Sequence, residues 1–331
     1  MSLKKNIASA VGNTPLWRLA EMAHKRPRVL FYHGVDDKPF VDKRIQGNQI
    51  SLPEFEKQMN FLKKNFEFIS IDRFYEMVAR NEKFTGNELV LTFDDGYKNN
   101  LTVAAPLLLA LDIPFTVFIA TDCVEKGTRV PTYYIRSAVF NESVRQLDIP
   151  SLSRKYIFNN DQERSACEND LIRIIKTLHN QVVRNVVSDI SHNLSTEQIE
   201  EADERFISEQ ILSWDDTIKL SEVGATIASH TMEHTVLHAN QDEETIREQL
   251  SQSKAAIEAK IGVCDFFAFP NGDKQSVCPL SVDLAGETYK MSFAVDGRAV
   301  RQDYNINFIS RIGVCEVFGA ARSQISILSL K

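Results

Sequence analysis

Two adjacent carboxylates, Asp94 and Asp95, end the apolar segment 89–93 and stand within the sequence T-F-D-D-G at 92–96. Where a buried strand ends the chain turns, so both side chains can point into one crevice. Like charges held this close oppose joint ionisation unless a cation compensates them. The pair alone leaves two interpretations open: a cation site, or the cap and first-turn acid of the next helix.

Two histidines, His230 and His234, follow the apolar segment 225–228 at H-x-x-x-H spacing. This spacing places both imidazoles on one side of a helical turn, within reach of one divalent ion. The alternative is an ordinary helix start with two exposed histidines. Together with Asp95 they would supply two nitrogens and one oxygen and leave a position open, as hydrolytic zinc sites do. We therefore expect one divalent metal ion, with zinc as the first candidate.

Two further segments end in polar or turn-forming residues. His33 follows the apolar segment 29–32, and Pro270-Asn271-Gly272 follows 266–269. Taken alone, His33 fits a hydrogen-bonded structural histidine, and the second sequence is only a turn signal. Their position after apolar segments suggests that they share a rim with the carboxylates and the histidine pair.

The elements that must position these residues are short apolar segments alternating with patterns of helical period. This alternation predicts a parallel sheet with helices outside, and seven or eight such units favour a closed barrel. Continuous apolar strands agree with a sheet buried on both faces. In barrels, active sites form where the strands end. We expect strands at 29–32, 66–71, 89–93, 114–119, 225–229, 266–269, 291–295 and 308–314.

One stretch, about 132–211, contains no good strand and three helical patterns, at 171–179, 182–190 and 196–206. No linker composition sets it apart. We therefore interpret it as a helical insertion into the barrel, acting as a lid or side wall. The predicted organisation is an N-terminal helical extension over 1–27 and a barrel over 28–331 that carries this insertion.

Composition limits the partners. Among 331 residues, 38 Lys and Arg against 45 Asp and Glu give a net charge of −7, which disfavours nucleic-acid and anionic-membrane binding. We find neither an apolar run long enough to span a bilayer nor a signal-peptide core, so we expect a cytoplasmic protein. The five cysteines are scattered without a C-x-x-C pair, which argues against a disulfide framework or a thiolate zinc site.

With these motifs in place, the chain resembles the polysaccharide deacetylase family, carbohydrate esterase family four, also called the chitooligosaccharide deacetylase homology domain. The family's first motif, T-F-D-D-G, is intact at 92–96, and its second, H-[ST]-x-x-H, stands at 230–234. The dipeptide at 32–33 and the sequence F-A-F-P-N-G at 267–272 look like one branch of the family. The resemblance extends from about residue 28 to 314.

The resemblance implies a distorted seven-stranded parallel (β/α) barrel that hydrolyses N-acetyl, less often O-acetyl, groups on a carbohydrate. Asp94 would be the general base, and Asp95, His230 and His234 would bind a divalent metal whose bound water is the nucleophile. The backbone N–H of Tyr97 would stabilise the oxyanion. Pro270, Asn271 and Gly272 are expected to contact substrate.

The sequence departs from the family pattern at two places. Ala268 stands where the common third motif has an arginine that orients the base, and no histidine follows His238, so the C-terminal acid is missing. We expect Arg311, at the end of the last strand, to replace the arginine beside Asp94. We expect His33 to replace the missing C-terminal histidine as general acid.

Three functions remain open at this point. The first is deacetylation of an N-acetylated glycan, oligosaccharide or lipid-linked sugar. The second is hydrolysis of a small non-sugar amide, favoured if the insertion closes the site into a small pocket. The third is carbohydrate binding without catalysis, which has no need of an intact base. An open groove would suit a polymer and a closed pocket a metabolite.

Overall fold

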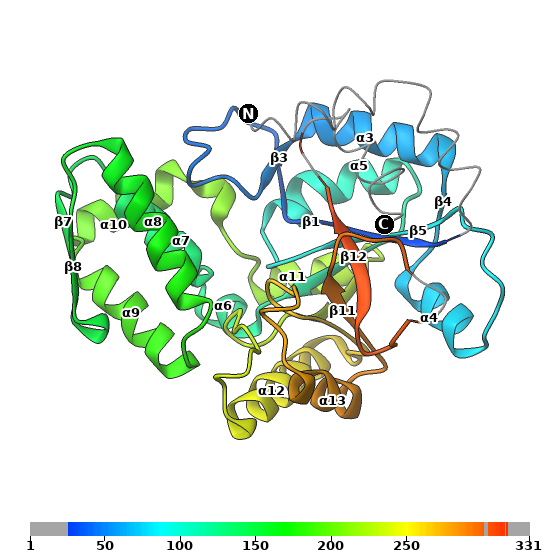
Figure 1. Ribbon diagram of the computed structural model, residues 1–331. Helices are drawn as coiled ribbons and strands as arrows, with labels where there is room; N and C mark the ends of the chain where they lie inside the picture. The colour runs from blue at the N-terminus through cyan, green and yellow to red at the C-terminus, as the bar shows by residue number, and fades with distance from the viewer. Residues whose placement is uncertain (1–25, 301–303, 315, 317–331) are drawn as a thin grey trace.

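The computed structural model describes residues 26–300, 304–314 and 316. All but the last two residues of the predicted N-terminal extension, 1–27, lie outside the described residues. Seven parallel strands form a closed barrel in the order β1-β12-β11-β10-β9-β6-β5, and β5 pairs with β1 to complete it (Figure 1). The predicted seven-stranded barrel is confirmed. Its strands are β1 (Arg28–Tyr32), β5 (Glu88–Phe93), β6 (Phe115–Ile119), β9 (Thr226–Ser229), β10 (Phe266–Ala268), β11 (Met291–Val295) and β12 (Ile309–Gly313).

Alternate residues of each strand face the barrel interior, since side chains alternate along a strand. The rings of Phe118 on β6 and Phe293 on β11 lie 5.7 Å apart although their strands are not neighbours, so they meet inside the barrel. Val90 on β5 and Ile309 on β12 belong to the same buried cluster. The interior is therefore filled by apolar side chains, as in other closed barrels of this size.

The predicted strand at 66–71 is wrong in its extent. Only β4 (Glu67–Phe68) forms, paired with the first two residues of β5 outside the closed ring. Ser70 caps the next helix, α4 (Ile71–Ala79), by accepting a hydrogen bond from the Arg73 N–H. This cap starts a helix where the apolar pattern alone suggested that the strand continues.

The helices cover the outside of the barrel, and a short parallel pair, β2 (Gly34–Asp36) and β3 (Gln49–Ser51), follows β1 (Figure 1). Helix α12 (Glu243–Ile261) ends at Gly262, whose φ of 95° is left-handed. After β5 the helical part of the chain begins with a π-helical turn at Asn100–Ala104. The remaining outer helices are α3 (Leu52–Asn65), α5 (Ala105–Ala110), α6 (Thr121–Lys126), α11 (Trp214–Glu222) and α13 (Pro279–Thr288).

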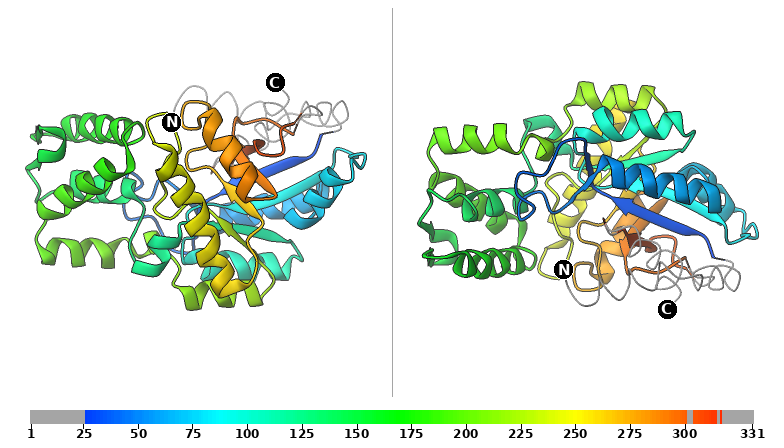
Figure 2. Two further views of the ribbon diagram at one scale, coloured as in Figure 1. Left: turned by 90° about the horizontal axis from the view of Figure 1, so that it is seen from below. Right: turned by 90° about the horizontal axis from the view of Figure 1, so that it is seen from above.

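The insertion forms a separate lobe beside the barrel, as both views of Figure 2 show. It packs around its own apolar cluster, which includes Leu171, Val186 and Ile190. Its elements are α7 (Pro131–Val139), β7 (Gln146–Ile149), β8 (Arg154–Ile157), α8 (Asp161–Ile175), α9 (Asn180–His192) and α10 (Thr196–Arg205).

The expectation that the insertion lacks strands is wrong, because β7 and β8 form an antiparallel hairpin. Leu147 and Ile149 are buried while Gln146 and Asp148 are exposed, so the hairpin has the alternation of a half-buried strand. Four residues are too few for that alternation to stand out in the sequence. None of the helices in the described ranges is both long enough and apolar enough to cross a membrane.

Candidate functional site

The base candidate Asp94 continues the inward face of β5, two residues beyond Thr92. Arg311 lies on the inward face of β12, two residues beyond Ile309. Its two terminal nitrogens donate to the two carboxylate oxygens of Asp94 at 2.6 and 2.8 Å, and one of them also donates to the Thr92 hydroxyl at 3.2 Å. The predicted proximity of Arg311 and Asp94 is confirmed.

Burial and ion pairing act in opposite directions on Asp94, which is 4% exposed. Burial by itself raises the pKa of this carboxyl, but the charge and hydrogen bonds of Arg311, with smaller effects of His230 and His33, together outweigh burial, so the pKa of Asp94 is lowered. The guanidinium is held between the rings of Phe31 and Phe118, at 4.8 and 5.2 Å from their centres. Asp94 is thus kept ionised although it is buried.

Asp95, His230 and His234 converge beside this pair. One potential ligand atom from each residue lies within 4.8 Å of the others. His230 follows the inward face of β9, and the left-handed backbone of Asp95, with a φ of 72°, turns its carboxyl to the same side. Asp95 Oδ1 lies 3.6 Å from Nε2 of His230 and 3.3 Å from Nε2 of His234.

The chemistry of this set fits a divalent cation. Asp95 Oδ1 is buried and has no hydrogen-bond partner among the described residues, which is costly unless a cation binds it. Burial lowers the pKa of both His230 and His234 to about 4, so both imidazoles are neutral at pH 7, as metal ligands must be. Nδ1 of His230 lies 2.7 Å from the Ala268 carbonyl oxygen, which fixes the ring with Nε2 toward Asp95.

The histidine pair does not lie on a helix, contrary to the sequence-based expectation. Residues 231–233 form a turn, in which Thr231 has a φ of 65°, and His234 follows with 57°. The Thr235 N–H donates to the Thr231 hydroxyl at 2.8 Å and closes this turn. The two rings therefore meet edge to face, with centres 5.0 Å apart, instead of lying one above the other on a helix surface.

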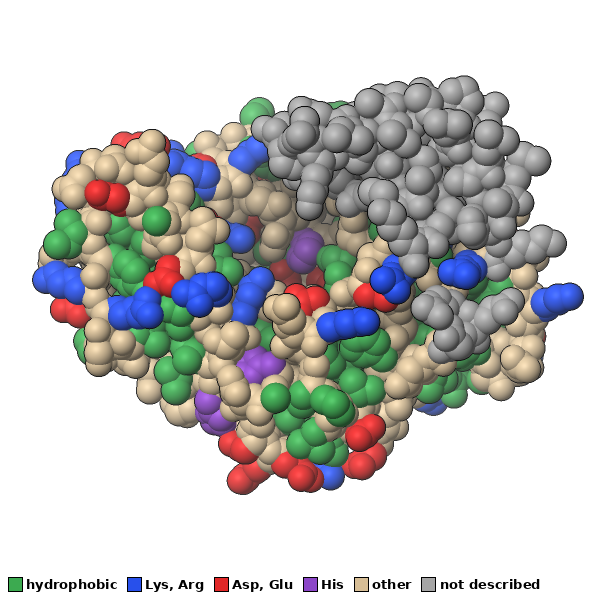
Figure 3. Space-filling view, in the orientation of Figure 1, with side chains coloured by type: hydrophobic (Ala, Val, Ile, Leu, Met, Phe, Trp, Pro, Cys, Tyr) green, Lys and Arg blue, Asp and Glu red, His purple; other side chains and the backbone are tan. Residues whose placement is uncertain are grey.

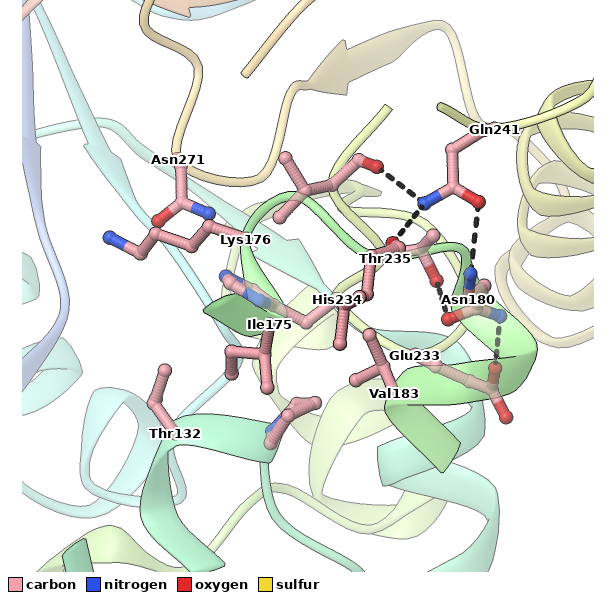
Figure 4. A pocket seen from close by; sticks show the side chains of 13 residues that line it. Thr132, Ile175, Lys176, Asn180, Val183, Glu233, His234, Thr235, Gln241 and Asn271 are labelled. Atoms are coloured by element: carbon pink, nitrogen blue, oxygen red, sulfur yellow. Dashed lines mark hydrogen bonds between the residues drawn. The ribbon is translucent and has the colours of Figure 1, made fainter. Parts of the chain in front are cut away.

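The insertion holds this turn from outside. Asn180, the first residue of α9, accepts a hydrogen bond from the Thr235 hydroxyl at 3.0 Å and donates to Glu233 at 2.8 Å. Its backbone N–H donates to Gln241 at 3.0 Å (Figure 4). His234 is thus flanked on both sides by residues that α9 positions.

A pocket of about 220 Å³ opens onto these groups. Figure 3 shows it as a hollow with histidine and acidic side chains at its floor. The strand-end residues that line it, as expected, are Asp94, Asp95, His230, His234, His33 and Asn271. Sequence reasoning missed the other polar residues of the wall, which are Asn48, Thr132, Arg136 and Lys176. Thr132, Arg136 and Lys176 come from the insertion, so the predicted side wall is present.

The other predicted site residues lie behind the pocket surface. Pro270 and Gly272 are buried and shape the turn that presents Asn271. Gly272 has a φ of 64°, and a Cβ there would lie 3.0 Å from the Phe269 carbonyl oxygen. Tyr97 is also buried, and its backbone forms a bridge with Ile211 where the insertion returns to the barrel. Their roles toward substrate stay predictions.

Comparison with known proteins agrees with this geometry. The family model described as polysaccharide deacetylase matches residues 81–157 and 158–287, together more than half of the chain. The chain therefore belongs to the polysaccharide deacetylase family. It is accordingly a carbohydrate deacetylase, a hydrolase that acts on carbon–nitrogen bonds other than peptide bonds. The search of curated proteins returned no match.

Solved structures show the same fold. The chain is similar to the deacetylase PplD of Streptococcus pyogenes, solved with acetate, with a TM-score of 0.57 and 15% identity over 88% of this chain and 93% of that one. IcaB from Ammonifex degensii gives a TM-score of 0.57 and 17% identity over 91% and 98%. The polysaccharide deacetylase BC0361 from Bacillus cereus gives a TM-score of 0.54 and 16% identity over 91% of this chain and 69% of that one.

Proposed function

We propose that this chain is a metal-dependent deacetylase that removes the acetyl group from an N-acetylated sugar, with Asp94 as general base. One observation carries the proposal: an ionised carboxylate held by Arg311 stands directly beside an Asp-His-His set suited to one divalent cation. Pure carbohydrate binding would require neither group. The catalytically inactive alternative is therefore the weakest of the three.

Zinc is the proposed metal, and Asp95, His230 and His234 would hold it. A divalent ion there supplies Lewis-acid polarisation of the acetyl carbonyl and a lowered pKa for water. The chain supplies the proton transfers. Asp94, kept ionised by Arg311, accepts the proton of the attacking water.

The departing amine needs a proton, and we assign its donation to His33. This residue continues the inward face of β1 and lines the same pocket as Asp94 and His234. It is only partly buried, so solvent reaches it. Asn271, presented into the pocket by its turn, is the proposed contact to the sugar, and the Tyr97 N–H is the proposed oxyanion donor.

The pocket favours a compact substrate. Its volume of about 220 Å³ is below the ~300–1,000 Å³ of pockets that enclose drug-sized ligands, and the insertion walls one side. A monosaccharide, an oligosaccharide end or a lipid-linked sugar fits this shape better than the interior of a polymer. The same shape keeps the small non-sugar amide as the second candidate. The cytoplasmic location stays a prediction.

Acetate release from a substrate panel tests the proposal. The panel contains N-acetylated monosaccharides, oligosaccharides and lipid-linked sugars, one N-acetylated polymer, one O-acetylated sugar and several small amides, each with and without added zinc. We expect zinc-dependent release from the short N-acetylated sugars. Release from small amides alone would replace the proposal by the second candidate.

A further inference from the structure

Two cationic side chains of the insertion face the pocket. Arg136 lies on α7, and Lys176 follows the last residue of α8. Both line the pocket that contains Asp94, Asp95 and the histidines, and both are partly buried. Lys and Arg side chains border the hollow on the side of the insertion (Figure 3). Lys176 lies next to Asn271 in the close view of the adjoining hollow (Figure 4).

One of these cations is ion-paired and the other has no ion pair among the described residues. Glu168 accepts from Nε of Arg136 at 3.0 Å, while the two terminal nitrogens of Arg136 have no hydrogen-bond partner among the described residues. Lys176 has no carboxylate within ion-pair distance among those residues. Asp273 acts on it only from farther away.

The carboxylates of the pocket already have partners. Both oxygens of Asp94 are bound to Arg311, and Asp95 belongs to the set suited to a cation. With a divalent ion in that set, the pocket would be positively charged, although the chain as a whole carries a net charge of −7. The wall formed by the insertion therefore attracts an anion at a place where the substrate must lie.

The two cations also disfavour one another. Burial lowers the pKa of Lys176. The negative charge of Asp273 raises this pKa, and the positive charge of Arg136, with a smaller effect, lowers it. Two partly desolvated like charges facing one cavity are unfavourable unless an anion lies between them. A carboxylate or phosphate would accept two hydrogen bonds from the Arg136 guanidinium and one from Lys176.

We propose that Arg136 and Lys176 form an anion subsite, and that the substrate is an acidic N-acetylated sugar with a carboxylate or phosphate on or next to the acetylated ring. This inference rests on the proposed function and narrows its substrate class. It also gives the insertion a role in specificity: α7 and the residue that follows α8 carry the groups that select the substrate, and the barrel carries those that cleave it.

Calorimetric binding of sugars without an acetyl group tests the subsite independently of turnover. Glucuronate and glucose 6-phosphate are compared with glucose on the wild type and on the variants Arg136→Met and Lys176→Met. We expect at least one of the two acidic sugars to bind at least ~10-fold more tightly than glucose to the wild type. In each variant the ratio of the two affinities should fall about tenfold. The pair of acidic ligands distinguishes a carboxylate site from a phosphate site.

Matched variants separate charge from structure. Lys155 is exposed on β8 of the same insertion and outside the pocket, so Lys155→Met should keep the full preference. Arg136→Lys retains the positive charge and should keep more of the preference than Arg136→Met. A preference that survives Lys176→Met and Arg136→Met would mean that the anion binds elsewhere, and it would overturn the subsite. Equal binding of glucose and the acidic sugars by the wild type would overturn it as well.

Acetate release then links the subsite to catalysis. Two acidic substrates, N-acetylglucosamine 6-phosphate and N-acetylglucosaminuronate, are each compared with neutral N-acetylglucosamine. The kcat/KM for the acidic substrate divided by that for the neutral one should fall about tenfold in Lys176→Met. An unchanged ratio would overturn the substrate assignment. If no sugar released acetate while the acidic sugars still bound through Arg136 and Lys176, the deacetylase proposal would fail and the anion subsite would stand.

Discussion

Arg311 binds both carboxylate oxygens of Asp94 through its two terminal nitrogens, at 2.6 and 2.8 Å, although 217 positions separate the two residues. The contact is possible because β12 and β5 both pair with β1, on its two sides. Ala268 on β10 leaves no side chain that could play this part. The charge state of the proposed base therefore depends on the last strand of the barrel.

Replacing Arg311 by Gln should shift the pH dependence of turnover. Arg311 lowers the pKa of Asp94, so its loss raises that pKa, and Asp94 becomes protonated at higher pH. The acid limb of the kcat/KM profile should move to higher pH. The free energy of unfolding should fall by about 3–5 kcal/mol, because a buried carboxylate loses its partner. Arg311→Lys, which keeps the charge, should shift the limb less, and an unmoved limb in Arg311→Gln would contradict the pairing role.

Replacing Asp94 by Asn should abolish turnover and spare the metal. The amide accepts no proton, and a positioned base contributes ~10²–10⁴-fold to the rate. Asp94 is not in the ligand set, so elemental analysis should show an unchanged metal content. Asp265→Asn, which removes a partly exposed partner of Lys290, is the control for loss of a carboxylate. Near-normal acetate release by Asp94→Asn would remove the base assignment.

Metal removal should affect both activity and stability. A chelator should abolish acetate release and lower the Tm, since a ligand at 100 times its Kd stabilises the folded state by about 2.7 kcal/mol. His230→Ala should lose most of the metal, whereas His192→Ala, on the exposed side of α9, should retain it. Full metal occupancy in His230→Ala would show that the ligand set is wrong.

The role of His33 can be tested by changing the leaving group. An amine must be protonated as it departs, whereas the phenolate of an activated aryl acetate leaves without a proton. His33→Gln should therefore lower amide hydrolysis by ~10²–10⁴-fold and ester hydrolysis by less than ~10-fold. Asp94→Asn should impair both reactions. Equal losses on both substrates in His33→Gln would argue for a packing role of this residue.

The strand ends were the predictable part of the site. Asp94 and His230 each follow an apolar segment, and Arg311 lies within the last strand; in a parallel barrel such strand ends meet at one rim. Because side chains alternate along a strand, every second residue faces the barrel interior, and this places all three residues on the inward face of the barrel. Their geometry follows from short-range patterns and one topological rule.

The wall of the pocket was not predictable in the same way. Arg136 and Lys176 lie on or next to helices whose orientation depends on how the insertion packs around Leu171 and Val186. No local pattern in the sequence distinguishes them from other charged residues of those helices. The turn at His234 escaped prediction for a related reason, since its left-handed backbone is held by contacts with Asn180, 54 positions earlier in the chain.

Closure of the barrel has a consequence for biosynthesis. β1 leaves the ribosome early, but one of its two neighbours, β12, is the last of the seven barrel strands to be made. At ~5–20 residues per second, β1 waits on the order of tens of seconds for that neighbour. During this interval one edge of β1 is unpaired, and the guanidinium that keeps Asp94 ionised does not yet exist. Closure of the barrel and formation of the Asp94–Arg311 ion pair therefore both depend on the same strand, β12.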